Sequence, residues 1–288
     1  MSRLVALVLV AGLAACANGG AHNNDAAGGG DARHNDAREH EDGERGSDGS
    51  GSDAMPMGPS HVLLSEVCLG PDGAEFVELV NPTTSAVDLS HYYLSNHGSY
   101  FKLPAGAPTL PQDHFIVQFP AGASIAPAGI ITVAMLSASS FQSAYGVMPT
   151  YSITDGTMTN TDLNLTPHLT DSGAFVVLFQ WDGSTALVRD VDMMFAGTVQ
   201  SPNTLISKSG YTQMGVSYAA DANTIPQTQP TPALGKSTKR VALEGSHETQ
   251  AGVGNGITGH DETSEATNLT WDQTFSNPTP NAAPAAIL

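Results

Sequence analysis

From residue 61 onward the chain consists of short apolar runs separated by turn residues, and this pattern restricts it to β structure. Most runs have the roughly five to eight residues of a buried strand, and Gly, Pro, Asn and Asp lie between them. Residues 139–146 have instead the character of a short helix that ends at Gly146. Because helices do not alternate with the strands, we expect an all-β sandwich rather than a parallel α/β sheet. The strand-like runs are HVLLSEVCL (61–69), AEFVELV (74–80), HYYLS (91–95), YFKL (100–103), HFIVQF (114–119), GIITVAM (129–135), AFVVLFQW (174–181), ALVRDVDMMF (186–195) and KSTKRVAL (236–243).

The charge of the chain argues against one class of partner. The formal net charge is −18 at pH 7, and the part after residue 60 has 19 acidic and 6 basic residues. A surface that binds phosphate groups requires clustered Lys and Arg, and only Lys236, Lys239 and Arg240 lie close together in the sequence. Direct nucleic-acid binding is therefore disfavoured.

The N-terminus has the pattern of a secreted lipoprotein. A short positive region, MSR, precedes about a dozen apolar residues, which are too few for a permanent membrane span of roughly 20. Leu13-Ala14-Ala15-Cys16 then resembles a bacterial lipobox. We predict that residues 1–15 are a lipoprotein signal peptide and that Cys16 becomes the acylated N-terminus. An ordinary signal peptide followed by a chance cysteine is the alternative.

The predicted anchor also suggests a location. Acyl chains contribute about 0.8 kcal/mol per buried methylene, so several chains on Cys16 would make membrane attachment effectively permanent. Ala17 and Asn18 lack the Asp that retains many Gram-negative lipoproteins in the inner membrane. We therefore expect the outer membrane of a Gram-negative bacterium, and the face of that membrane stays open.

Residues 16–60 are predicted to be a disordered linker. Gly, Asp, Asn and Ser dominate the segment, so burial cannot offset the entropy of ordering it. A flexible chain of this length has a root-mean-square span of about 35–40 Å, which would lift a domain clear of lipid headgroups. His22, His34 and His40 lie among carboxylates, but the composition favours a solvated linker over a metal site.

Motifs in the remaining part follow the order and spacing of one known family. They are LLSEV (63–67), AEFVELVNP (74–82), VDLSHYYLS (87–95), FPAG (119–122), APAG (126–129), LTDSGAFVVL (169–178), STKR (237–240), Trp271 and PTPN (278–281). Together they resemble the lamin tail domain, also called the intermediate-filament tail domain. This resemblance implies an immunoglobulin-like β-sandwich over residues 61–283. Ala128 departs from the family's glycine, and we expect insertions at about 197–235 and at 244–268, the second of them polar and mobile.

Two glutamates and an asparagine in the second motif are candidate site residues. Glu75 and Glu78 are three apart on a strand, so they should point to opposite faces and cannot form one carboxylate pair. Glu78 matches a family glutamate that the resemblance implies is structural, with hydrogen-bond donors inside the sandwich. Glu75 is expected to be solvated. Asn81 precedes a proline at a turn, where its side chain can cap local backbone groups.

Motifs for enzyme chemistry are missing from the sequence. It contains no G-x-S-x-G, no H-E-x-x-H, no C-x-x-C and no phosphate-binding G-x-x-x-x-G-K-[ST]. His91 and His97 flank an apolar strand, which favours a surface or packing role over zinc binding. Cys68 lies in a strand-like run and is interpreted as a small buried residue, with a reactive thiol or an intermolecular bridge as alternatives. We therefore expect a protein that is not an enzyme and has no cofactor.

Calcium is the metal ion that the sequence leaves open. The loops TDGT (154–157), NTD (160–162) and HDE (260–262) are rich in oxygen ligands, but none fits an EF-hand. Solvated acidic loops are the favoured interpretation, so no metal ligand is assigned.

These observations lead to two hypotheses about function. The first is a lipid-anchored, non-enzymatic binding or structural module that holds envelope proteins or polysaccharide. The second is an accessory module for a separate nuclease or phosphoesterase, because the resemblance implies that such bacterial domains are often fused to hydrolases. A hydrolase activity of the chain itself has no supporting constellation of residues.

Overall fold

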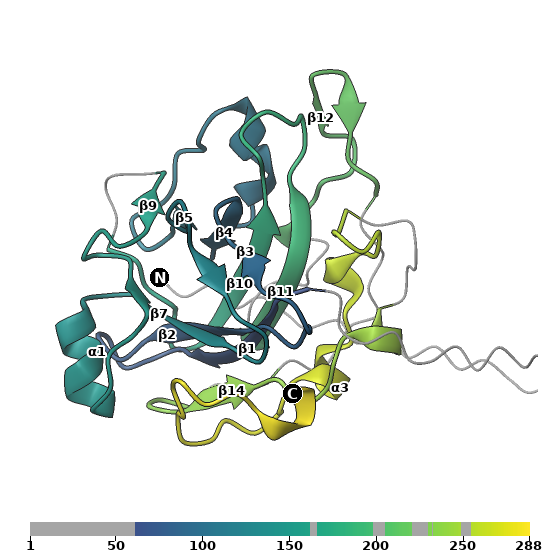
Figure 1. Ribbon diagram of the computed structural model, residues 1–288. Coiled ribbons are helices and arrows are strands. Elements are labelled where there is room, and N and C mark those ends of the chain that lie inside the picture. The colour runs from purple at the N-terminus through teal and green to yellow at the C-terminus, as the bar shows by residue number, and fades with distance from the viewer. Residues whose placement is uncertain (1–60, 162–165, 198–204, 221–229, 232, 249–254) are drawn as a thin grey trace, which may run out of the picture. The chain divides into compact units, whose positions relative to one another are not determined.

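The computed structural model describes residues 61–161, 166–197, 205–220, 230–231, 233–248 and 255–288 (Figure 1). The predictions about the signal peptide, Cys16 and the linker fall outside the described residues. All described residues belong to one compact unit of the chain, Asp53–Leu288. Within them, no helix is long and apolar enough to cross a bilayer.

Two five-stranded sheets form the body of the described part, as the all-β prediction required (Figure 1). The first has the order β14-β1-β2-β7-β8, with bounds Ser237–Lys239, Leu63–Cys68, Phe76–Val80, Ile130–Ala134 and Tyr151–Ser152. The second has the order β11-β10-β4-β5-β9, with bounds Arg189–Gly197, Gly173–Gln180, Tyr92–Ser95, Ile116–Gln118 and Thr159–Asn160. Neighbours pair antiparallel except β7 and β8, which are parallel.

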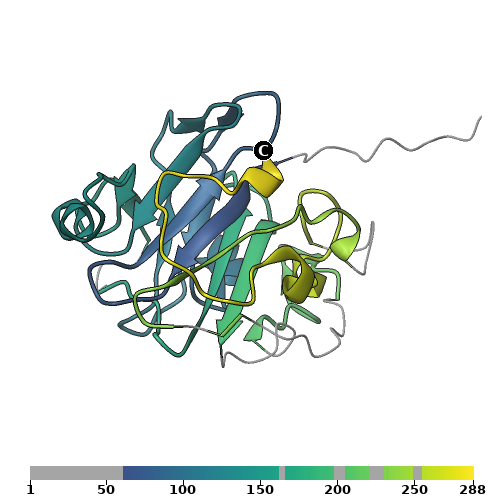
Figure 2. The ribbon, with the colours of Figure 1, turned by 90° about the horizontal axis from the view of Figure 1, so that it is seen from below.

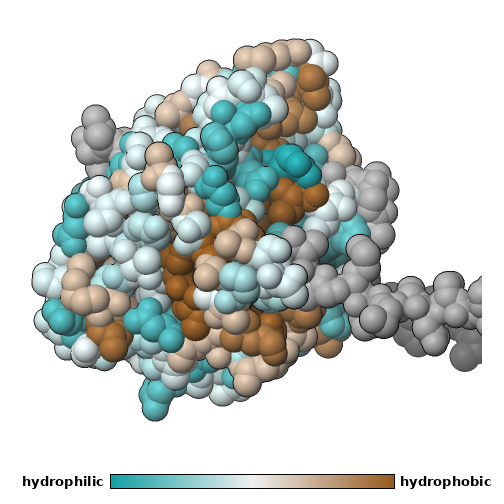
Figure 3. Space-filling view, viewed as in Figure 1, coloured by the Kyte–Doolittle hydropathy of each residue, from teal (hydrophilic) through white to brown (hydrophobic). Residues whose placement is uncertain are grey.

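Smaller elements complete the fold. Two ribbons pair β3 with β6 and β12 with β13, with bounds Val87–Asp88, Ser124–Ile125, Thr212–Gln213 and Val216–Ser217. The short helices are α1 (Ala138–Tyr145), η1 (Tyr100–Ala105), η2 (Gly245–His247), η3 (Glu262–Ser264), α3 (Thr267–Thr270) and η4 (Ala285–Ile287). The β12–β13 hairpin lies at the top of Figure 1, and Figure 3 shows apolar surface in the same region. Met214, between the two strands, is 72% exposed.

One helix was predicted correctly, and one predicted strand is wrong. Helix α1 begins after Ser137, whose side chain accepts from Ser140 N, and ends at Gly146 with φ of 73°. The run YFKL forms the 3-10 helix η1 instead of a strand. Tyr100 and Leu103 are buried three residues apart, which places both on one face of a helix with three residues per turn. A four-residue apolar run does not distinguish this pattern from a strand.

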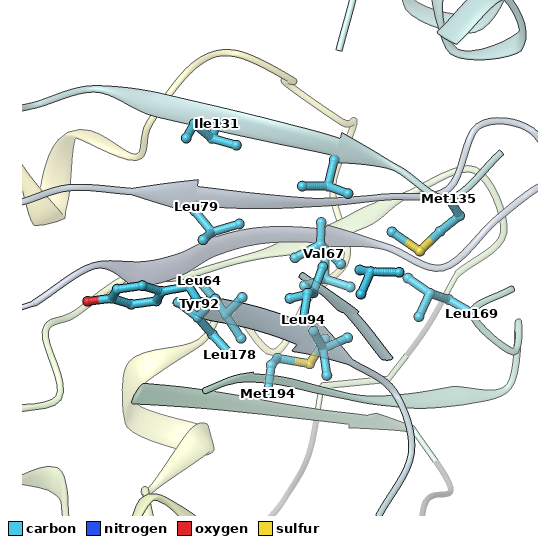
Figure 4. Packing of buried hydrophobic residues seen from close by; sticks show 14 of the residues in the cluster. Leu64, Val67, Leu79, Tyr92, Leu94, Ile131, Met135, Leu169, Leu178 and Met194 are labelled. Atoms are coloured by element: carbon cyan, nitrogen blue, oxygen red, sulfur yellow. The ribbon is translucent and has the colours of Figure 1, made fainter. Parts of the chain in front are cut away.

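The main core lies between the two sheets. Figure 4 shows Leu64, Leu79 and Ile131 of the first sheet facing Leu178 and Met194 of the second. Residues 77 and 79 of β2 point into this core, whereas residues 76, 78 and 80 point to the outer face of the first sheet.

The outer faces of both sheets are also covered. On the first sheet, Phe76 meets Phe141 of α1 edge to face, with ring centroids 5.6 Å apart. On the second sheet, Phe179 packs against Tyr100 of η1 at 4.9 Å between centroids. Figure 2 shows the C-terminal segment crossing the first sheet over β1 and β2. Because both faces of each sheet are covered, many strands have continuous apolar sequences and not an alternation of apolar and polar residues.

Ala128 occupies a backbone conformation that favours glycine, and we expect Ala128→Gly to stabilise the fold. Its φ is 54°, while its N–H donates to Asn81 O at 2.8 Å and so keeps the turn in place. The left-handed region costs an L-residue about 1–2 kcal/mol, and the greater chain entropy of glycine offsets about 0.5–1 kcal/mol. The free energy of unfolding should therefore rise by up to about 1 kcal/mol in urea denaturation.

The matched control for this substitution is Ala121→Gly. Ala121 is an exposed turn alanine outside the positive-φ region, so glycine there should only destabilise. Equal effects of the two substitutions on the free energy of unfolding would contradict the inference that the positive φ of Ala128 destabilises the fold.

Candidate functional site

Glu78 joins the first sheet to the C-terminal segment. Its side chain is fully buried and accepts hydrogen bonds from Ser65 Oγ at 3.1 Å, Thr132 Oγ1 at 3.2 Å and Asn281 N at 2.6 Å. Burial, and then repulsion from Glu66 on the neighbouring strand, raise the pKa of Glu78 to about 7. Ser65 and Thr132 belong to β1 and β7, so the expectation that Glu78 accepts hydrogen bonds within the sandwich is confirmed. These donors lie on the outer face of the first sheet.

Glu66, on the neighbouring strand β1, binds the same C-terminal segment. It lies opposite Glu78 in the β1–β2 register and accepts from Thr279 N and Thr279 Oγ1, both at 2.9 Å. Ser237 Oγ of β14 donates to it as well. Glu66 was not singled out from the sequence, although it lies within the LLSEV motif. The two glutamates together hold the PTPN motif against the sheet.

Glu75 is buried, and the prediction that it is solvated is wrong. It is 1% exposed and accepts from Leu169 N at 2.8 Å, while His168 Nδ1 lies 2.8 Å from the same oxygen. Burial raises the pKa of Glu75 to about 7 against the opposing effect of these hydrogen bonds. The sequence does not reveal that residues 166–172 cover this end of β2. Glu75 and Glu78 share no hydrogen-bond partner among the described residues.

Asn81 organises the turn that follows β2. Its amide nitrogen donates to the carbonyl oxygens of Ser85, Ile125 and Ala126 at 2.8, 3.0 and 3.1 Å. Its Oδ1 accepts from Thr83 N at 3.0 Å and from Thr83 Oγ1 at 2.7 Å. The side chain is fully buried, and its hydrogen bonds join the backbone of the turn at 81–85 to that of the loop at 125–126.

A bulge in β11 directs two aspartates to opposite faces of the second sheet. Asp192 pairs with Leu178 and Asp190 pairs with Phe179, so Val191 is the extra residue between them. Leu178 belongs to the core between the sheets, whereas Phe179 belongs to the apolar cluster on the outer face of the second sheet. A strict two-residue alternation would place both aspartates on one face.

On the outer face, Asp190 forms a buried ion pair with Lys208. Both side chains are at most 1% exposed, and Tyr100 Oη donates to Asp190 at 2.6 Å. The Lys208 ammonium also lies 5.4 Å from the Tyr100 ring centroid. Burial raises the pKa of Asp190, although Lys208 opposes that change. Lys208 comes from the expected insertion at 197–235, so part of that insertion is integrated into the fold.

On the other face, Asp192 meets Arg240, which is fully buried. The guanidinium donates through Nη2 to Asp192 at 2.6 Å, through Nη1 to Glu265 at 2.7 Å and through Nε to Leu64 O at 2.8 Å. It lies 4.9 Å from the Trp271 ring. Burial lowers the pKa of Arg240, but the neighbouring carboxylates outweigh burial and raise it. The resemblance pointed to STKR and Trp271 as family positions, and the structure brings Arg240 and Trp271 together.

Five carboxylates gather around this arginine, and we call them the acidic cluster. They are Asp192, Glu244, Glu248, Glu262 and Glu265. His61 Nε2 lies 2.9 Å from Glu244 Oε2, and His260 Nδ1 contacts Glu248 Oε2. Asp192 belongs to β11, whereas the other four belong to the stretches 244–248 and 261–265.

Glu262 is the least satisfied member of the acidic cluster. It is 1% exposed, and neither of its oxygens accepts a hydrogen bond from a described donor. Repulsion from Glu244, Glu248 and Asp192 acts on its carboxylate, and the carboxyl of Glu248 is within hydrogen-bonding reach. Carboxylate oxygens of Asp192, Glu244 and Glu262 lie within 4.8 Å of one another. Burial raises the pKa of all three carboxyls well above its ordinary value, and repulsion within the cluster adds to that change.

Two interpretations of the sequence are corrected by this cluster. The sequence predicts a solvated HDE loop, but Asp261 and Glu262 are 0% and 1% exposed. The sequence also groups Arg240 with two lysines as clustered basic charge, but Arg240 is paired with the carboxylates of Asp192 and Glu265. In the TDGT loop, by contrast, Asp155 is exposed and accepts from Ala138 N at 2.7 Å.

The remaining candidates have packing roles or lie outside the described residues. Cys68 is a buried free thiol, and burial raises its pKa. The His97 ring packs edge to face on His114, with centroids 4.9 Å apart, whereas His91 is exposed. Cys16 lies in the part that the structure does not describe.

Comparison with known proteins gives a distant structural similarity and no family. No family model matches the chain, and no curated protein matches its sequence. A crystal structure of a DUF4876 family protein from Bacteroides thetaiotaomicron VPI-5482 is similar, with 14% identity and a TM-score of 0.41. The match covers 78% of this chain and 75% of that one.

Proposed function

We propose that this chain is a lipid-anchored protein of the cell envelope whose sandwich domain, similar to a lamin tail domain, binds envelope components without catalysis. The main support for this proposal is that the buried acidic residues hold distant segments of the chain together. Glu66, Glu75, Glu78 and Asp192 are each at most 1% exposed, and each accepts hydrogen bonds from a segment distant in the sequence. A carboxylate enclosed in this way connects parts of the fold and does not reach a substrate.

The anchoring part of the proposal rests on the N-terminal sequence, and Cys16→Ser tests it. The substitution removes the thiol that would receive diacylglycerol, so the precursor should stay unprocessed and leave the membrane fraction. Incorporation of labelled palmitate should fall to background. Palmitate entering the variant as well as the wild type would contradict acylation at this cysteine. Sucrose-gradient fractionation of the wild type should place it in the outer membrane.

The binding part requires identification of a partner in intact cells. Cross-linking followed by purification of the wild-type chain should recover envelope proteins or polysaccharide that are absent when the released Cys16→Ser chain is purified in the same way. Recovery of a nuclease or phosphoesterase as the main partner would support the accessory role instead. Recovery of the same material with both chains would contradict a role at the membrane.

A further inference from the structure

We propose that Asp192, Glu244 and Glu262 form a structural binding site for Ca²⁺. This site is independent of the proposed function, because it concerns how the C-terminal stretches are held to the second sheet.

The first argument is the balance of charge in the acidic cluster. Arg240 uses Nη1 and Nη2 for Glu265 and Asp192, and its Nε donates to a backbone carbonyl. Glu244 Oε1 lies 4.0 Å from Arg240 Nη2 and accepts no hydrogen bond from a described residue. One guanidinium and two histidines therefore face five carboxylates, of which Asp192, Glu244, Glu262 and Glu265 are buried.

The second argument is the side chain of Glu262, which points into the cluster without a donor. A buried carboxylate requires a hydrogen bond or a positive charge to offset its loss of hydration. Glu262 Oε1 lies close to the backbone of Gly256, in space that a larger residue would fill, because a Cβ atom there would be 2.5 Å from this oxygen. The backbone of Gly256 is in turn fixed, since its N–H donates to His260 O at 2.9 Å. Glu262 is thus confined beside Glu244 and Asp192.

The third argument is distance. Two oxygens bound to one Ca²⁺ at about 2.3–2.6 Å can be no more than about 5.2 Å apart. The oxygens of Asp192, Glu244 and Glu262 lie within 4.8 Å of one another, so each pair is close enough to share one ion. Further carboxylate oxygens without a described donor, on Glu248 and Glu265, complete an oxygen-rich environment.

The ligand chemistry favours Ca²⁺ over other divalent ions. Carboxylate oxygens are hard ligands, and Ca²⁺ accepts them in irregular geometry and in large number. Mg²⁺ retains several waters, which a closed cluster does not favour. Zn²⁺ prefers nitrogen and sulfur, and the two histidine side chains here already contact Glu244 and Glu248. A Ca²⁺ ion would connect β11 with the stretches that contain η2 and η3.

Thermal denaturation of the full-length chain after treatment with a chelator tests the proposal. The Tm of the wild type should rise as CaCl₂ is added through the millimolar range, because the ion binds only the folded state. Calcium sites of extracellular modules have dissociation constants of about 10⁻⁴–10⁻³ M, which sets the range to be tested. MgCl₂ and ZnCl₂ at equal concentrations should raise the Tm less. No rise with CaCl₂, or a larger rise with ZnCl₂, would overturn the assignment.

Glu262→Gln separates an ion site from a purely structural acid. The variant keeps the shape but removes one negative charge, so in chelator its Tm should be equal to or above that of the wild type. Its affinity for Ca²⁺ in calorimetric titration should fall at least about 10-fold, since even supporting residues of metal sites cost that much. Glu244→Gln provides the same readout if Glu262→Gln folds poorly. Asp155→Asn, in the exposed TDGT loop, is the matched control and should bind Ca²⁺ as the wild type does. An unchanged affinity in Glu262→Gln, or a lost one in Asp155→Asn, would overturn the proposal.

Discussion

Replacing Arg240 with methionine is expected to lower the free energy of unfolding by about 3–5 kcal/mol, because buried charges would lose their partner. Methionine matches the aliphatic stem of arginine, but it is shorter and has no hydrogen-bond donor. Of the hydrogen bonds to Asp192 from described residues, the one from Leu64 N would remain, and Glu265 would lose its hydrogen bond from Arg240. The Leu64 carbonyl would lose the Nε donor, and Trp271 the cation above its ring. Urea denaturation followed by tryptophan fluorescence measures the change, with Trp271 close to the affected site.

Two further variants show whether the effect belongs to the buried guanidinium. Lys239→Met removes the neighbouring cation, whose side chain is 19% exposed, lies 4.0 Å from Glu66 and donates to Asn277 O at 2.7 Å and to Ser276 Oγ at 3.2 Å. Because these contacts are partly exposed, we expect a loss of about 1–2 kcal/mol, smaller than that of Arg240→Met. Arg240→Lys keeps the charge but cannot reproduce three hydrogen bonds in one plane, so it should lie between the wild type and Arg240→Met. Equal, small effects of Arg240→Met and Lys239→Met would show that the cluster does not depend on Arg240.

The stability of the protein is expected to fall as the pH rises from about 4.5 to about 7. The pKa of Glu78 is about 7 in the fold, against an ordinary value of 4.5. The folded state then binds this proton more tightly than the unfolded state does, so stability is lost as the proton leaves. A change of this size corresponds to about 3 kcal/mol at most. Glu75, with a pKa of about 7, acts in the same direction.

Glu78→Gln should abolish the contribution of Glu78 to the pH dependence of stability. Glutamine does not ionise, so the stability difference between wild type and variant should shrink as the pH rises through the same window. Glu78→Ala should cost more at every pH, because the Asn281 N–H would lose its acceptor, at about 1–3 kcal/mol. Asp113→Asn, at an exposed position, is the control and should leave the pH profile unchanged. Parallel profiles for wild type and Glu78→Gln would contradict the raised pKa.

The strands could be predicted because apolar runs and turn residues are local signals. Eight of the runs identified from the sequence contain strands of the two sheets, and YFKL does not. The helix ending at Gly146 carried a local signal as well, in its left-handed C-terminal glycine. Strands of two residues, such as β3 and β8, leave no such trace, because long-range pairing alone defines them.

The candidate site could be predicted only in part, because burial depends on distant segments. The alternation along β2 separates Glu75 from Glu78, but it does not reveal that residues 166–172 cover the first. The bulge at Val191 sends Asp192 toward Arg240, which a two-residue period does not anticipate. The stretch 261–265 has the composition of a solvated loop. It is nevertheless buried, and Glu265 forms an ion pair with Arg240, which the local sequence does not indicate.

The measurement that tests the proposed function most directly is the mass of the N-terminal peptide of the protein purified from membranes. The account predicts a peptide that begins at Cys16 and carries a diacylglycerol group with a further acyl chain on its amine. A peptide that begins at Met1, or an unmodified Cys16 inside a longer N-terminal peptide, would contradict it.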